Sequence, residues 1–363
     1  MRCALGLVAG LIGAQLLQPA VRAQSDVPRP TFAEFLAGIR TEALARGIRA
    51  NILDEALAHI DEPNAVILER DRTQAEAVLP LEQYLDQRVT TKAVATGRDM
   101  LSRYHDLLEQ ISTRYRVAPS LIVGIWGFES NYGRFSGVRP TIAALATLAW
   151  DPRRSALFRS ELFDALDILN RGDIELPRLK GSWAGAMGQV QFMPSSYLKF
   201  AEDFDGDGRR DIWATPSDIF ASIANYMKGH GWVDGEGWGV EVSVSSDARK
   251  HISTTVEPRN GTCRATRDMT GVLPVATWQA LGVRTATGES LSVETPDAAL
   301  VTGPARAFLV SRNYDALLEY NCSHAYAIGV GLLSDRIAGA APPHPAKAKA
   351  AKASKPKHKK SQA

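Results

Sequence analysis

Cysteine is scarce in this chain of 363 residues, which holds three cysteines in all. They form no C-x-x-C pair and no cysteine–histidine spacing of the kind that binds zinc. The glycines between Gly181 and Gly188 are not followed by the Lys-Ser/Thr pair of a phosphate-binding loop. The composition, with 45% hydrophobic and 23% charged residues, is instead that of a globular protein with ample length for a core.

The apolar run near the N-terminus, Cys3 to Leu17, has about fifteen residues, fewer than the ~20 that a membrane span needs. It follows Arg2 and precedes a Val-Arg-Ala site, which together predict a signal peptide, 1–23, cleaved after Ala23. Cys3 stands before this run, whereas a lipoprotein cysteine would follow it. We therefore expect an exported, periplasmic protein that is not a lipoprotein, and an uncleaved membrane anchor is the disfavoured alternative.

A strong positive charge within the fold is also lacking. The formal net charge is +2, yet seven of the lysines lie after Gly339 in a tail without any acid. The segment 24–338 is therefore acidic on balance, which excludes a typical nucleic-acid-binding domain. The tail, 340–363, is rich in Ala, Pro and Lys, which predicts disorder and a loose contact with anionic envelope surfaces.

Removal of the signal peptide leaves two cysteines, Cys263 and Cys322. An even number of cysteines in an oxidising compartment predicts a disulfide between them. Two buried free thiols are the alternative.

Amphipathic helices dominate most of the sequence, because apolar residues recur at three- and four-residue spacing on both sides of Tyr115. From Gly237 the pattern changes to short β-branched runs, among them VEVSVS, HISTTVE and ARAFLVS, which predict strands. We therefore expect a mainly α (α+β) protein. Its predicted parts are an N-terminal helical subdomain at 24–116, a second helical block at 117–236, a small β-rich insert at 237–312, a return to the second block at 313–339, and the tail.

One carboxylate stands out in the stretch GIWGFESNYG, 124–133, which is otherwise largely apolar, aromatic or glycine. Pro119 suits the first turn of a helix, and Asn131 favours the left-handed conformation that ends one. Glu129 follows Ile125 by four residues and so shares the apolar face. Lost hydration and the negative end of the helix dipole would both raise its pKa, as an acid working near neutral pH requires.

A surface glutamate, or one paired with an arginine such as Arg153 or Arg154, is the alternative interpretation of Glu129. Against it stand six blocks that resemble, in the same order, the lytic murein transglycosylase B family. The resemblance spans nearly the whole mature chain and implies a lysozyme-like catalytic core. The blocks are GIWGFESNYGRFSG, DPRRSALFRSEL, GSWAGAMGQVQFMPSSY, DFDGDGRRDIW, SIANYMKGHGW and YNCSHAYAIGV.

The resemblance implies that Glu129 is the only catalytic acid and that no cofactor is required for the chemistry. It implies glycan strands of peptidoglycan as the partner, and we expect a monomer that binds no nucleic acid. Tyr226 and Tyr326 could equally be core aromatics on sequence grounds alone. The substrate contacts that the resemblance implies are Arg153, Arg154, Ser182, Gln191, Tyr226, Tyr320, Asn321 and Tyr326.

Hydrolytic glycosidases generally need two carboxylates, and no second acid lies near Glu129 in the sequence. In the family that the chain resembles, the substrate supplies the rest: the N-acetyl group of the muramyl residue stabilises the developing cation and its own C6 hydroxyl attacks. Glu129 would act as acid and then as base, leaving a 1,6-anhydromuramyl end. A hydrolysing muramidase and a catalytically inactive peptidoglycan-binding protein remain as alternatives.

An acidic loop reproduces the opening of an EF-hand, D-x-D-x-D-G, with Asp203, Asp205 and Asp207 as ligands and Arg209 placed to offer its backbone carbonyl. The usual closing glutamate is missing, and the resemblance implies that Asp218 supplies the closing carboxylate. The sequence therefore predicts a structural Ca²⁺ site, and a solvated acidic turn is the alternative.

Overall fold

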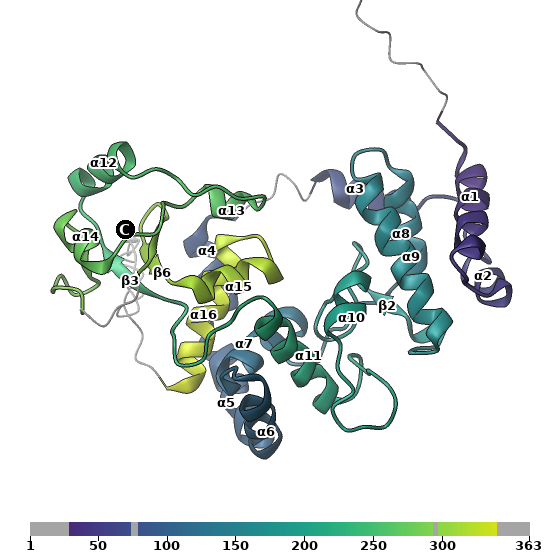
Figure 1. Ribbon diagram of the computed structural model, residues 1–363, viewed down its shortest axis with the longest axis horizontal. Coiled ribbons are helices and arrows are strands. Elements are labelled where there is room, and N and C mark those ends of the chain that lie inside the picture. The colour runs from purple at the N-terminus through teal and green to yellow at the C-terminus, as the bar shows by residue number, and fades with distance from the viewer. Residues whose placement is uncertain (1–28, 74–78, 293–296, 340–363) are drawn as a thin grey trace, which may run out of the picture.

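The computed structural model describes residues 29–73, 79–292 and 297–339 (Figure 1). The signal peptide predicted at 1–23 and the tail predicted at 340–363 lie outside these residues. No helix among the described residues has the length and apolar character to cross a membrane.

Helices make up most of the described chain. They are α1 (Phe32–Ala45), α2 (Ala50–Ala56), α3 (Ala65–Thr73), α4 (Leu81–Arg88), α5 (Thr91–Arg103), α6 (His105–Tyr115), α7 (Pro119–Ser130), α8 (Thr141–Trp150), α9 (Ser155–Arg171), α10 (Pro194–Phe200), α11 (Pro216–Gly229), α12 (Ser246–Thr255), α13 (Arg264–Arg267), α14 (Val275–Ala280), α15 (Arg312–Tyr320) and α16 (His324–Ala338), with a 3₁₀ turn, η1, at Leu176–Arg178. This composition confirms the mainly α class.

The strands are short and form two antiparallel sheets. They are β1 (Arg139–Pro140), β2 (Lys180–Gly181), β3 (Gly239–Ser243), β4 (Arg284–Thr285), β5 (Ala299–Thr302) and β6 (Ala307–Val310). The first two pair with each other, and the other four form a sheet in the order β4-β3-β6-β5.

Helix α7 lies at the centre of the fold and packs against α5, α11 and α16. It begins at Pro119 and ends at Ser130, and it is capped by Asn131, whose φ of 50° is left-handed, so both predicted boundary signals are confirmed. Its burial extends beyond the single predicted apolar stripe, because the residues from Leu121 to Trp126 are all buried. A helix buried on every side can expose a functional group only near an end, and Glu129 lies in its last turn.

The helices of the predicted 24–116 subdomain divide between two groups. Helices α1 and α3 pack against α8, and α2 packs against α9, on the right of Figure 1. Helices α4 and α5 pack against α16, and α6 packs against α11, in the middle of the molecule. The chain from α4 onward therefore contributes directly to the surroundings of α7.

The β-rich segment holds a four-stranded sheet with its own small core around Trp278. The run VEVSVS covers most of β3, and ARAFLVS contains β6; the two strands pair directly, for example Glu241 with Phe308. The prediction for HISTTVE is wrong, because most of this run belongs to helix α12. Its β-branched residues are overridden by a helix cap at Ser245 and by burial of Ile252, since tertiary context routinely outweighs propensity. A further β-branched run that predicts a strand, SLSVETP at 290–296, lies partly outside the described residues.

A disulfide joins Cys263 and Cys322, with an S–S distance of 2.01 Å, which confirms the predicted pairing. Cys263 precedes α13 in the β-rich segment, and Cys322 lies between α15 and α16. The bridge therefore fixes that segment to the junction of α15 and α16, and α16 packs against α7.

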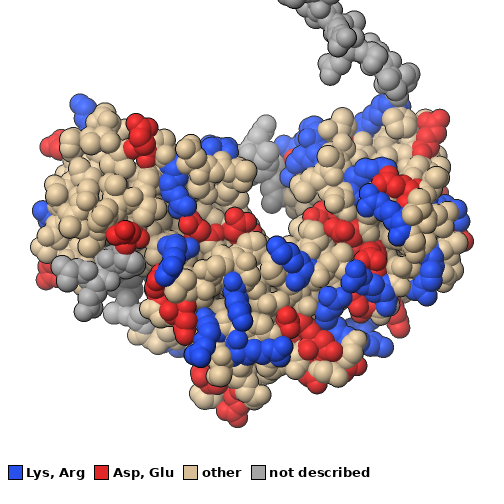
Figure 2. Space-filling model, viewed as in Figure 1, with Lys and Arg blue, Asp and Glu red and all other residues tan. Residues whose placement is uncertain are grey.

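The surface is hollowed between two lobes in the view of Figure 2. One lobe carries β3, β6 and α12 to α14, and the other carries α1 to α3 with α8 and α9. Side chains of both charge signs line the margins of the hollow.

Candidate active site

Glu129 is partly exposed in the last turn of α7, where its Oε1 accepts a hydrogen bond of 2.5 Å from the hydroxyl of Tyr326. Burial raises the pKa of Glu129 to about 7, while the Tyr326 hydroxyl and the charge of Arg88 act in the opposite direction. A carboxyl with this pKa holds a transferable proton near neutral pH and can take one back. The predicted direction of the shift is therefore found, with desolvation as its main cause.

Arg88 and Tyr84 are two neighbours of Glu129 that the sequence analysis missed. Both lie on α4, one turn apart. Arg88 donates a hydrogen bond to the backbone carbonyl of Phe128, and its guanidinium carbon lies 4.9 Å from the centre of the Phe128 ring. The ring of Tyr84 lies 6.4 Å from that of Phe128. Burial raises the pKa of Tyr84, and the charge of Glu129 acts in the same direction.

Aromatic rings continue from Glu129 along α16, α15 and α11. Tyr326 stacks with Tyr320 at 6.2 Å between ring centres, and Tyr320 lies 4.7 Å from Tyr226. Burial raises the pKa of Tyr320 and Tyr326 well above the usual value, so both hydroxyls stay protonated as donors. Tyr226 is buried and donates to the carbonyl of Glu319. Three of the predicted contact residues thus form one aromatic wall beside the acid.

The glycine-rich loop before α10 supplies two further predicted residues, Ser182 and Gln191. The Ser182 hydroxyl accepts from the backbone N–H groups of Ala184 and Ala186, so it holds the loop's own turn. Gln191 has a φ of 53°, an uncommon value for a residue with a side chain and one that clusters at functional sites. Its side chain donates to the carbonyl of Gly188.

The remaining predicted contacts lie in different surroundings. Asn321 is exposed and follows α15. Arg153 and Arg154 both pair with Asp71, a buried carboxylate on α3, and Arg153 also pairs with Asp151. The guanidinium groups of the two arginines are therefore held by Asp71 on α3 and, for Arg153, also by Asp151 at the end of α8, and neither arginine lines the cavity that contains Glu129.

That cavity has a volume of about 340 Å³ and lies between α4, the first half of α5 and the end of α7. Glu129 is the only acid among its lining residues, which otherwise include three basic side chains: Arg88, Lys92 and Arg134. Neither Lys92 nor Arg134 has an ion pair or side-chain hydrogen bond within the described part of the chain.

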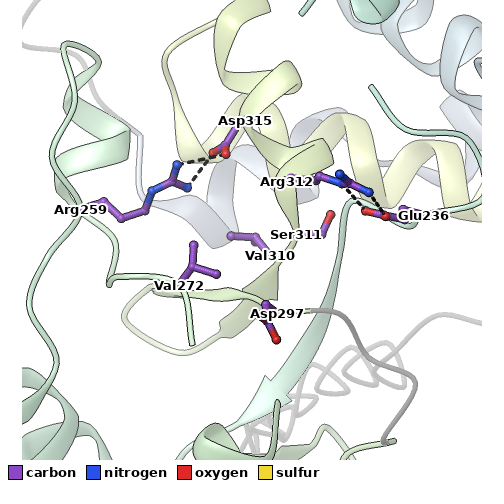
Figure 3. A pocket seen from close by; sticks show the side chains of 8 residues that line it. All are labelled: Glu236, Arg259, Val272, Asp297, Val310, Ser311, Arg312 and Asp315. Atoms are coloured by element: carbon purple, nitrogen blue, oxygen red, sulfur yellow. Dashed lines mark hydrogen bonds and ion pairs between the residues drawn. The ribbon is translucent and has the colours of Figure 1, made fainter. Parts of the chain in front are cut away.

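A second cavity, of about 360 Å³, lies where the four-stranded sheet meets α15 (Figure 3). It holds more charged groups, and four of the five are paired: Arg259 donates to Asp315 from both terminal nitrogens, and Arg312 pairs with Glu236. The fifth, Asp297, has no ion pair within the described residues. Charges neutralised in this way favour a structural role for the cavity. The Glu129 cavity instead holds a single acid, which has no ion pair within the described residues and whose pKa burial raises to about 7.

The buried acids elsewhere in the described chain differ from Glu129, since each forms an ion pair or accepts a hydrogen bond from a nitrogen group, whereas Glu129 accepts from the Tyr326 hydroxyl. Glu161, for example, accepts from both the backbone N–H and the hydroxyl of Ser195. The full set is Asp71, Asp151, Glu161, Asp218 and Glu241.

The acidic loop brings carboxyl oxygens of Asp203, Asp205 and Asp218 within 4.8 Å of one another. Asp218 is buried at the start of α11, and burial raises its pKa, with Asp205 and Asp203 adding to the effect. A cation of the kind that oxygen ligands bind would relieve this repulsion. Asp207 is not among these converging carboxylates, so the convergent set is smaller than the predicted one; its carboxylate accepts from the backbone N–H of Arg209.

A mainly helical fold that places one acid without an ion pair beside a wall of tyrosines defines a lysozyme-like protein with a single-acid site. The chain belongs to the transglycosylase SLT domain family, whose model matches residues 31–335.

Known proteins of this kind resemble the chain in sequence and structure. It is 44% identical over 156 residues to membrane-bound lytic murein transglycosylase B of Escherichia coli (strain K12), a match that covers 42% of this chain and 43% of that protein. The chain thus matches less than half the length of this curated relative. SltB3 from Pseudomonas aeruginosa, solved with NAG-NAM-pentapeptide, superposes with a TM-score of 0.76 and 38% identity over 85% of this chain and 80% of that one.

The Escherichia coli lytic transglycosylase Slt35 has been solved in complex with calcium. It superposes with a TM-score of 0.69 and 27% identity over 86% of this chain and 94% of that chain.

Proposed function

We propose that this protein is a peptidoglycan lytic transglycosylase, which cleaves the β-1,4 bond between N-acetylmuramic acid and N-acetylglucosamine and leaves a 1,6-anhydromuramic acid end. Family membership supports this activity. The SltB3 neighbours also support it, because one was solved with NAG-NAM-pentapeptide and another with NAG-anhNAM-pentapeptide.

The observation that carries the proposal is the isolation of Glu129. It is the only acid lining its cavity, and its pKa is raised to about 7. Hydrolysis by two carboxylates requires a second one within about 5 to 9.5 Å of the first. A single acid with a pKa near neutrality suits a reaction in which the same group gives a proton and takes one back.

In the proposed reaction, Glu129 protonates the glycosidic oxygen as the C1–O bond of the muramyl residue breaks. The muramyl C6 hydroxyl then attacks C1 and transfers its proton to Glu129, which returns to its starting form. No water is consumed, and no cofactor takes part. Tyr326 holds the Oε1 atom of Glu129 throughout, so the other oxygen is free to face the glycosidic bond.

The proposed glycan contacts follow the aromatic wall and the glycine-rich loop. The partly exposed ring of Tyr320 offers an apolar face, and buried Tyr226 packs against that ring at 4.7 Å. Exposed Asn321 offers an amide at the end of α15. The role proposed for Arg153 and Arg154 requires that a sugar or peptide group approach guanidiniums already held by Asp71, and their partial exposure leaves room for that.

We also infer that the acidic loop binds Ca²⁺ for stability. Asp203, Asp205 and Asp218 would hold the ion, and Asp207 and Arg209 of the predicted set would complete its surroundings. The calcium complex of Slt35 supports this assignment. Catalysis does not pass through the ion.

We propose that the mature protein acts in the periplasm and that the basic tail, 340–363, adds a loose electrostatic contact with anionic envelope surfaces. Deletion of this tail should leave turnover of soluble fragments intact and reduce retention on sacculi at low salt. Unchanged retention would exclude that role.

The deciding experiment is mass analysis of the fragments released from purified peptidoglycan. The expected muropeptides end in anhydromuramic acid and weigh one water less than hydrolysis products. Glu129→Gln should lower turnover by at least the ~10² to 10⁴ that general acid–base catalysis contributes. A product mixture dominated by reducing ends would instead identify a hydrolysing muramidase, and binding without turnover would identify an inactive wall-binding protein.

A further inference from the structure

Beyond the proposed glycan contacts, we propose that a basic track along α5 and the loop after α7 binds the acidic peptide stem of the substrate. The proposal rests on the function proposed above. The track consists of Lys92, Arg103 and Arg134 and begins at the cavity that contains Glu129.

Two neighbouring cavities define the course of the track. Lys92 lines the Glu129 cavity, and Arg103 lines a different cavity of about 380 Å³, which is not the one in Figure 3. Thr96, Tyr132 and Arg134 line both, so the two cavities adjoin. Lys92, Thr96 and Arg103 are spaced by four and seven residues, which places them on one face of α5.

The charge of this surface is unbalanced. The cavity around Arg103 has no acid in its lining, and the Glu129 cavity has only the catalytic acid. All three basic side chains of the track are exposed and make no ion pair within the described residues. Asp99 lies one turn before Arg103 on α5 but lines neither cavity. In a protein whose body is acidic on balance, such a surface favours an anionic ligand.

The length of the track fits a short peptide. Lys92 and Arg103 lie about 16 Å apart along the helix at 1.5 Å per residue. An extended peptide of five residues spans about 17 Å. A muramyl stem starts from the sugar whose bond Glu129 would break, and it carries several free carboxylates, so it would leave the Glu129 cavity as an anionic chain of the required length.

The test compares two substrates prepared from one batch of peptidoglycan: strands that carry peptides, and strands from which an amidase has removed them. The variant is the triple change Lys92→Gln, Arg103→Gln and Arg134→Gln. We expect its KM for peptide-bearing strands to rise about tenfold at low salt, the product of three exposed charge contacts. Its KM for stripped strands should rise about twofold or less.

The matched control removes the same charge elsewhere, through Arg70→Gln, Lys228→Gln and Lys250→Gln, at exposed positions that line neither cavity. It should show no difference between the two substrates. For the unmodified protein, raising the salt concentration from about 50 to 300 mM should raise KM for peptide-bearing strands alone, because exposed charges are screened. If the triple variant does not fold, each single change should show part of the same effect.

Equal changes of KM on the two substrates, or the same discrimination in the control triple, would overturn the peptide track. If the triple variant bound only the stripped strands more weakly, the three cations would contact the glycan rather than the peptide. That result would also overturn the peptide track. The proposed function is tested separately, since Glu129→Gln should abolish anhydro products from both substrates. Anhydro products with an unaffected triple variant would leave the function standing and refute the track.

Discussion

Replacement of Glu129 by glutamine should stabilise the folded protein, and the gain should grow with pH. Burial raises the pKa of Glu129 from 4.5 to about 7. The folded state therefore holds this proton more tightly than the unfolded state does. The resulting stability is fully present below about pH 4.5, is lost as pH rises towards 7, and is absent above it. A pKa difference of this size corresponds to about 3 kcal/mol, a cost of ionisation that the neutral glutamine never incurs.

The assay is urea denaturation of the unmodified protein and of Glu129→Gln at pH 5 and pH 8. The difference in the free energy of unfolding should be about 1 kcal/mol or less at pH 5 and about 3 kcal/mol at pH 8. The glutamine carbonyl can still accept from Tyr326, so this contact is retained. Glu109→Gln, at an exposed position on α6, is the matched control and should show no such pH-dependent gain.

The reasoning would be refuted if the free energies of unfolding of the two proteins differed by the same amount at pH 5 and pH 8. A group that titrates between these pH values cannot produce a difference that is independent of pH. A lower stability of Glu129→Gln at pH 8 would be a stronger contradiction. It would mean that the carboxylate is stabilised by its surroundings, and then the group could not serve as an acid near neutral pH.

Three further outcomes follow from the same contacts. The positive charge of Arg88 lowers the pKa of Glu129, so Arg88→Met should move the alkaline fall of kcat/KM to higher pH, as a pH–rate profile would show; an unmoved profile would contradict this electrostatic role. Ca²⁺ should raise the melting temperature, by an amount equivalent to about 2.7 kcal/mol at a hundredfold excess over Kd. Asp205→Asn should remove most of this rise, and identical melting curves in Ca²⁺ and in chelator would exclude the site. Replacing both Cys263 and Cys322 by serine should lower stability by about 4 kcal/mol, measured by denaturation, since the bridge closes a separation of 59 residues; a loss below about 1 kcal/mol would contradict this.

The sequence was sufficient where function follows from one continuous segment. Proline at the start and asparagine at the end of α7 are local signals, and the periodicity between them placed Glu129 on an apolar face. The disulfide could be predicted because only two cysteines remained to pair.

Features that depend on distant segments could not be predicted in this way. Arg88 precedes Glu129 by about forty positions, and nothing in α4 itself reveals that its end meets the end of α7. The pairing of Arg153 and Arg154 with Asp71 has the same origin, since α3 is brought to the start of α9 by packing alone. In α12 a cap and one buried isoleucine outweighed the strand preference of β-branched residues.

The environment of Glu129 combines opposing influences, and their balance is what the proposed reaction needs. Burial alone would hold the proton too tightly for the carboxyl to release it to the glycosidic oxygen. Arg88 and Tyr326 act in the other direction and stabilise the charged form that exists between proton donation and proton recovery. Arg88 lies on α4 and Tyr326 lies on α16, and both contact the last turn of α7. The packing of these three helices therefore sets the pKa, so mutations at the contacts of α4 or α16 with α7 should change the pH dependence of turnover without touching substrate.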